Sequence, residues 1–196
     1  MTRAIHPFPA DFEMEEVADP GEGGPVFGFP DPPPERVDLP FAWEEPSRLC
    51  VRFRRPDGTE WTGVFHHHYP TPAATCVTTM PDPRRAAVVA SGRGTLVDVE
   101  EPARSEVVHC NVILHVLPLV ARGLIVFVDM SGLCAYGKAG LLWETIDFLI
   151  DDIEIGEVVD DALVVRAWTI WGDQDTVAVD LATGRTSSTN FRLRTP

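Results

Sequence analysis

Short stretches in which apolar and polar residues alternate follow one another from residue 47 almost to the end of the chain. Residues 49–54 (LCVRFR) and 60–65 (EWTGVF) show the period of two that places side chains on opposite faces of a strand. Between them, Pro56-Asp57-Gly58 has turn chemistry, because proline presets φ and glycine accepts a positive φ. Further runs lie at residues 86–90, 95–99, 107–117, 119–130, 133–136, 141–145, 153–158, 163–171, 176–181 and 189–193. The pattern predicts a mainly β fold, an antiparallel meander of about a dozen short strands.

Glycine turns divide this part of the chain into four hairpin-like units. The turn glycines recur at intervals of roughly 40 residues, each between two apolar runs. They are Gly58, Gly94, Gly132 and Gly172. Such spacing is typical of repeated β units that bury their apolar faces by packing on one another. The sequence therefore predicts a small propeller-like arrangement or a packing of two sheets, and it leaves both open.

Two segments in the last third of the chain carry a more specific pattern. GLCAYGKAGLLWET, which contains Trp143, and TVAVDLATGRTSS each consist of a strand-like run and a glycine turn. In these segments, residues 119–190 resemble blades of PQQ-type β-propellers. The resemblance implies repeated β units over these residues. It implies no function, because no set of cofactor-binding residues has a counterpart here.

The first 46 residues differ in composition from the rest, and we call them the arm. They contain ten of the 18 prolines, eleven acidic residues and two arginines. Proline fixes φ and removes a backbone donor, so we expect little regular structure beyond a short helix at residues 11–17. Disordered tails are poor in aromatic residues, so the rings of the arm are expected to be buried. These rings belong to Phe8, Phe12, Phe27, Phe29, Phe41 and Trp43. We predict an irregular, proline-rich acidic arm (1–46) packed on a single β domain (47–196).

The net charge of −14 restricts the classes of partner. It repels nucleic acid and anionic membranes, so neither is predicted as a partner, whereas a basic protein is attracted. No apolar run reaches the ~20 residues that cross a bilayer, and the first residues lack the pattern of a secretion signal. Cysteines in apolar surroundings and far apart in sequence predict buried free thiols; they are Cys50, Cys76, Cys110 and Cys134. Together with an arginine bias typical of GC-rich bacterial genomes, these features predict a bacterial, cytoplasmic protein of undetermined oligomeric state.

A run of three histidines, residues 66–68, ends one of the predicted strands. His66 and His68 would share a face of that strand, and neutral imidazoles bind zinc, copper or nickel. A third ligand is expected from His109 or His115, which also share a face in strict alternation. One interpretation is therefore a divalent transition metal at His66, His68 and His109, and the other is a solvated loop. No other cofactor is expected.

Residues 144–161 contain eight carboxylates and no basic residue. In the segment DIEIGEV, alternation places the carboxylates on one face of a strand and the apolar groups on the other. This face is either an interaction surface for a basic partner or a solvated sheet face. Nearby, Trp168 and Trp171 should face opposite sides, so one of them is expected to be exposed. The candidate partner-binding residues are Asp151, Asp152, Glu154, Glu157, Asp160 and Asp161.

Arginines concentrate at residues 48–55 and 84–85. They would bind phosphate or pair with the acidic arm, and we favour pairing with the arm. These residues are Arg48, Arg52, Arg54, Arg55, Arg84 and Arg85.

The chain lacks the common catalytic signatures, among them the G-x-S-x-G elbow, the P-loop and H-E-x-x-H. We therefore predict a non-catalytic binding protein of unknown ligand that neutralises a basic protein, as immunity proteins do. The alternative is a metal-binding protein or a metal-dependent enzyme that uses the histidine cluster, and an enzyme is the less favoured of the two classes.

Overall fold

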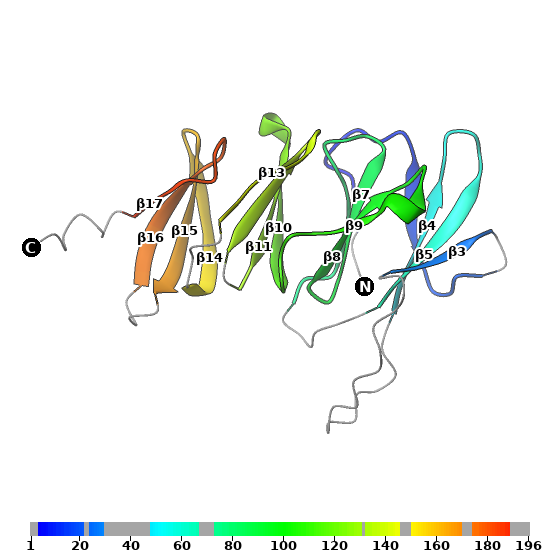
Figure 1. The fold of residues 1–196 in the computed structure, drawn as a ribbon, viewed down its shortest axis with the longest axis horizontal. Helices are drawn as coiled ribbons and strands as arrows, with labels where there is room; N and C mark the ends of the chain where they lie inside the picture. Colours follow the sequence, from blue (N-terminus) through cyan, green and yellow to red (C-terminus); the bar gives the residue numbers. More distant parts are fainter. Residues whose placement is uncertain are drawn as a thin grey trace, which may run out of the picture. The chain divides into compact units, whose positions relative to one another are not determined.

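The computed structural model describes residues 4–21, 24–29, 48–66, 73–130, 132–145, 150–169 and 174–188. It is mainly β, which confirms the predicted fold class. The chain divides into two compact units, residues 1–108 and 109–196, called here the first and second unit. Each unit contains two small sheets, and none of the four sheets closes into a barrel (Figure 1).

The first unit contains the first and second sheets. The strands of the first sheet are β2 (Glu13–Val17), β3 (Val26–Phe29), β4 (Arg48–Arg54) and β5 (Glu60–His66). The second sheet contains β1 (Ala4–Ile5), β6 (Cys76–Thr79), β7 (Arg85–Ala90), β8 (Arg93–Asp98) and β9 (Glu106–Val107), with the short helix η1 (Pro102–Arg104) before β9. The strand orders are β2-β4-β5-β3 and β1-β6-β7-β8-β9. Two pairs, β1 with β6 and β3 with β5, are parallel, which the predicted antiparallel meander did not include.

The arm supplies three of these strands, so the prediction of a short helix at residues 11–17 is wrong. β2 lies antiparallel to β4 and buries Met14 in the core of the first unit. The glutamates on either side of Met14, Glu13 and Glu15, point away from that core and pair with Arg54 and Arg52. This alternation of acid, apolar residue and acid has the period of a strand, and the arginines that pair with the two acids belong to β4.

The described aromatic residues of the arm are buried or partly buried in the first unit. Phe8 is buried, Phe29 belongs to the core cluster, and Phe12 and Phe27 are partly buried against that cluster. This confirms the expectation for these four rings, whereas Phe41 and Trp43 lie outside the described residues.

Trp61 occupies the centre of that core. Its ring stacks on Phe53 with centroids 4.5 Å apart and meets the edge of Phe27 at 5.3 Å. The cluster continues into the second sheet through Val88 and Val97, so a single apolar interior joins the two sheets. Burial of large rings is the main source of stability in such a small unit.

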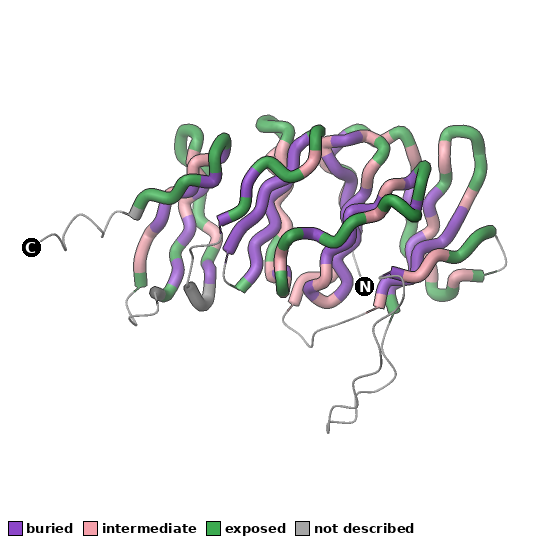
Figure 2. Tube along the Cα trace, in the orientation of Figure 1, coloured by how far each residue is buried: buried purple, intermediate pink, exposed green. Residues whose placement is uncertain are grey.

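The second unit also packs two sheets on one core (Figure 1). The third sheet runs in chain order through β10 (Ile113–Leu119), β11 (Leu124–Asp129), β12 (Leu133–Gly137) and β13 (Gly140–Thr145), with the short helix η2 (Val120–Arg122) after β10. The fourth sheet runs through β14 (Ile150–Val159), β15 (Ala162–Thr169), β16 (Gln174–Asp180) and β17 (Thr186–Ser188). Figure 2 shows that the inner strands of the third sheet, β11 and β12, are mostly buried, whereas β15 and β16 of the fourth sheet alternate between buried and more exposed residues.

The turn between β10 and β11 lies a few residues after Pro118, the residue that separates the predicted runs 107–117 and 119–130. Pro118 is inside β10, an edge strand, and it pairs with Ile125. An edge strand tolerates proline because one side of its backbone needs no ladder hydrogen bond. The turn is instead made by η2 and Gly123, whose φ of 61° is left-handed.

The same type of tryptophan hydrogen bond occurs once within each unit. Trp61 Nε1 donates to the backbone oxygen of Val99 at 3.0 Å, and Trp143 Nε1 donates to that of Leu181 at 2.8 Å. In both cases the acceptor lies 38 positions after the donor. Each tryptophan is in a strand of one sheet, and the acceptor directly follows a strand of the other sheet of the same unit. The indole therefore joins two sheets in each unit by ring packing and by a hydrogen bond.

An aspartate precedes each of the two acceptor residues and closes the following turn. Asp98 Oδ1 accepts hydrogen bonds from the N–H groups of the residues two and three positions later, at 3.1 and 2.8 Å. Asp180 Oδ1 does the same, at 3.2 and 2.8 Å, and also accepts the hydroxyl of Thr183 at 2.6 Å. The repetition of tryptophan, aspartate and turn indicates that the units are built on one plan.

Asp180 should make the melting temperature depend on pH. Hydrogen bonds from the hydroxyl and the N–H of Thr183 lower the pKa of this carboxyl below its usual 3.8. Its stabilising contribution is thus complete above about pH 4 and is lost as the pH falls through the lowered value. We expect Asp180→Ala to melt at a lower temperature than the natural chain at pH 7. Melting curves should show the difference shrinking toward pH 2, and a constant difference would contradict this role.

Candidate functional site

The acidic residues predicted to bind a partner lie on β14 and in the turn after it. β14 is an edge strand of the fourth sheet. Glu154, Glu157, Asp160 and Asp161 are exposed. For residues 151 and 152 only the backbone is described, and the side chains of Asp151 and Asp152 lie outside the described part of the structure.

Irregular pairing changes which way β14 turns its side chains. The predicted alternation holds from Ile153, which is buried, through exposed Glu154 to half-buried Ile155. The register against β15 then shifts between Ile155 and Val158, as it also does between Asp151 and Glu154. An extra residue in a strand redirects the side chains that follow. Val158 and Val159 are consequently exposed, beside the carboxylates.

Two of these carboxylates already have a cation within the second unit. Glu154 Oε2 lies 3.0 Å from Arg166 Nη2 on the neighbouring strand β15. Asp161 pairs with Arg122 of η2, which also donates to the backbone oxygen of Asp160 at 2.5 Å. Among the residues described, Glu157 and the side chain of Asp160 have no ion-pair partner. The negative charge at this edge is therefore only partly neutralised.

An exposed tryptophan lies on the outer face of the same sheet. Trp168 alternates along β15 with buried Ala167 and is 44% exposed. Residues 164 and 166 share its face, where Val164 is half-buried and Arg166 is exposed. This confirms that one of the two strand tryptophans is exposed, while Trp171 lies outside the described residues. Trp168 pairs with Asp151 at the start of β14, whereas Glu157 lies near the end of that strand and Asp160 in the turn after it. The exposed ring can contact a cationic side chain through its face.

The histidines of the predicted metal site are spread over the two units. His66 ends β5 in the first unit, His68 is not described, and His109 is exposed in the second unit. His109 Nδ1 lies 3.5 Å from Glu144 Oε2. In the described part of the chain, no group of three His, Cys, Asp or Glu side chains could hold a metal ion. The metal site stays a prediction from the sequence.

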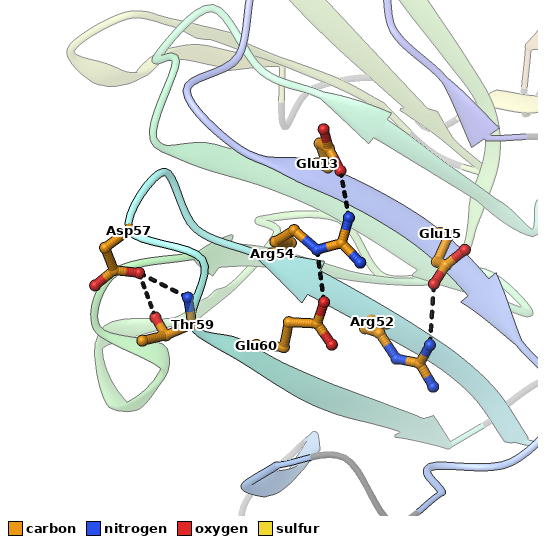
Figure 3. Close-up of polar contacts among 7 residues, drawn as sticks. All are labelled: Glu13, Glu15, Arg52, Arg54, Asp57, Thr59 and Glu60. Atoms are coloured by element: carbon orange, nitrogen blue, oxygen red, sulfur yellow. Dashed lines mark hydrogen bonds and ion pairs between the residues drawn. The ribbon is translucent and has the colours of Figure 1, made fainter.

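The arginine-rich strand β4 pairs with the arm, as we favoured. Arg52 Nη1 lies 3.1 Å from Glu15 Oε1 and Arg54 Nη1 lies 3.0 Å from Glu13 Oε2 (Figure 3). Arg54 Nε also contacts Glu60 on β5 at 2.5 Å. These pairs occupy the outer face of the first sheet, which leaves little free positive charge there for a phosphate.

Three other arginines of that group, Arg55, Arg84 and Arg85, bind elsewhere in the first unit. Arg55 donates to the backbone oxygen of Val99 at 3.0 Å, beside the indole of Trp61. Arg84 and Arg85 pair with Asp82 and Glu106, neither of which belongs to the arm.

Two cysteine side chains make a sulfur–sulfur contact that the sequence did not indicate. All four cysteines are free, as predicted, but only Cys50 and Cys134 are buried, and Cys110 and Cys134 are in contact. They are far apart in sequence, and only the register of the third sheet brings them together, so no local motif could have marked them.

The chain matches no protein-family model, and no curated protein is similar to it in sequence. The two helices among the described residues have three residues each, so neither is long enough to cross a membrane.

Proposed function

We propose that the protein is a non-catalytic binding protein that takes a basic protein segment on the fourth sheet. The observation that carries the proposal is the exposure of Trp168 on the outer face of a sheet whose edge strand carries Glu157 and whose first turn carries Asp160, two exposed carboxylates with no ion-pair partner among the described residues. One basic side chain of the partner would lie over the indole, and others, nearer the turn of the β14–β15 hairpin, would pair with these carboxylates. Tryptophan is also among the residues that contribute most to binding when covered by a partner.

The neighbouring ion pairs add specificity to this surface. Arg166 and Arg122 hold Glu154 and Asp161 in place, so a partner meets fixed charges rather than mobile side chains. Exposed Val158 and Val159 supply apolar area next to the charges. Basic partners are expected to associate fast and to dissociate as salt rises, because the charges that attract them are solvent-exposed.

Affinity capture from native lysate, followed by titration of the purified partner, tests the proposal. A stoichiometric basic protein should bind, and Trp168→Ala should weaken binding about tenfold or more. Glu157→Gln with Asp160→Asn should reduce the association rate and the salt dependence. Asparagine suits position 160, where φ is 53°, because it tolerates left-handed backbone.

A charge-matched control separates this surface from the general charge of the chain. Glu16→Gln with Glu100→Gln removes the same charge from exposed positions of the first unit. These changes should leave binding almost unchanged. Equal losses from both pairs of substitutions, or no partner at low salt, would contradict the proposal.

The setting we propose is the bacterial cytoplasm. Four free cysteines support a reducing compartment. The role of an immunity protein, which covers a basic toxin, is one concrete form of this function.

A further inference from the structure

Two thiols of the second unit lie almost within bonding distance. Cys110, in the segment that precedes β10, and Cys134, in β12, have their Sγ atoms 2.9 Å apart. A disulfide bond is about 2.05 Å long, so the sulfurs need to approach by only about 1 Å. No other pair of cysteine sulfurs is in contact among the described residues.

The backbone around Cys110 is fixed on both sides. The N–H of His109 donates to the hydroxyl of Tyr136 at 3.0 Å, and the N–H of Asn111 donates to Asp129 Oδ2 at 3.0 Å. Both acceptors belong to strands of the third sheet, β12 and β11. The segment therefore presents its thiol to the sheet without depending on the contact between the sulfurs.

Cys134 is equally well held. β12 is an inner strand, and Cys134 pairs with Phe127 of β11 and with Glu144 of β13. Its side chain is fully buried, whereas Cys110 is half-buried. One accessible thiol thus lies against one protected thiol, an arrangement in which the first reacts with a small molecule and the second with the first.

We propose that Cys110 and Cys134 form a reversible disulfide, with a peroxide as the oxidant. Cys110 Sγ attacks the peroxide, the O–O bond breaks, and Cys110 becomes a sulfenic acid with release of water. Cys134 Sγ then attacks Cys110 Sγ, the S–O bond breaks, and a second water leaves. The two thiols lose two electrons and two protons in total, and one hydrogen peroxide becomes two waters. A dithiol reverses the reaction by thiol–disulfide exchange.

The order of the two steps follows from burial. The hydrogen bond with Cys110 and desolvation raise the pKa of the Cys134 thiol, which disfavours its thiolate. Cys134 is thus a poor first nucleophile and serves as the resolving thiol. The bond would close a loop between residues 24 positions apart and tie the start of the second unit to the third sheet.

Counting thiols in the full chain tests the proposal. The reduced protein should show four free thiols in denaturant, and brief treatment with hydrogen peroxide should leave two, without covalent dimers. Peptide mapping should find residue 110 linked to residue 134. The melting temperature of the second unit should rise by on the order of 10 °C, and dithiothreitol should reverse every change.

Two sets of variants serve as controls. Cys50→Ser with Cys76→Ser removes the cysteines of the first unit and should preserve the loss of two thiols. Cys110→Ser and Cys134→Ser should each abolish the link and the rise in melting temperature. Four unreacted thiols, covalent dimers, or a sulfinic or sulfonic acid at Cys110 beside an intact Cys134 thiol would overturn the proposal.

Discussion

Replacement of Trp61 by alanine is expected to lower the free energy of unfolding of the first unit by about 3–5 kcal/mol. The indole is 2% exposed and contacts Phe53 and Phe27 at the centre of the core. Its loss leaves a cavity between two sheets, which these inward-facing rings can fill only in part. Urea denaturation followed by far-ultraviolet circular dichroism measures the change without depending on tryptophan fluorescence.

Phenylalanine at position 61 is the matched control. It keeps most of the ring packing and removes the Nε1–H donor to Val99. The Val99 oxygen still accepts a hydrogen bond from Arg55 Nε at 3.0 Å, so the cost should be only about 1 kcal/mol. If Trp61→Ala cost no more than Trp61→Phe, the ring would not be supporting the core, and this account of the first unit would be wrong.

The second large effect is expected at Trp143, with a loss of about 3–5 kcal/mol for Trp143→Ala in the second unit. This side chain is 6% exposed and packs among residues of both the third and fourth sheets. Gly184 lies against its ring: a Cβ added there would be 2.8 Å from the nearest indole carbon. Amide hydrogen exchange on the two units would show whether the loss is confined to residues 109–196.

Phenylalanine at position 143 should cost more than phenylalanine at position 61. Leu181 receives the Trp143 donor at 2.8 Å in a buried position. Removing that donor leaves the buried carbonyl oxygen without this hydrogen bond, which costs about 1–3 kcal/mol. Equal stability of Trp143→Phe and the natural chain would show that the indole donor contributes nothing.

Local alternation predicted most of the strands after residue 47, because each of them carries its own period; it missed β6, and the predicted run at residues 189–193 lies outside the described residues. β4 and β5 lie where the alternating runs and the Pro-Asp-Gly turn placed them. The strands of the arm were missed since their reasons are not local. β2 is stabilised by Arg52 and Arg54, which lie more than thirty residues further along the chain.

The candidate site was predictable in its charge but not in its shape. The acidic composition of residues 144–161 can be read directly from the sequence. The register shifts of β14 depend on how β15 pairs with it, and they decide that Val158 and Val159 are exposed. The contact between Cys110 and Cys134 likewise requires the pairing of β11 with β12, which no spacing of cysteines reveals.

The irregular edge of the fourth sheet has a consequence for aggregation. A long, flat edge strand offers a row of free backbone groups that a second chain can extend into a fibril. The two register shifts in β14 interrupt that row, and the carboxylates of Glu154 and Glu157 repel an identical strand. On the third sheet, Pro118 removes a donor from the edge strand β10. The second unit can therefore keep its outer face exposed, as the proposed binding requires, while resisting growth through the edge strands β10 and β14.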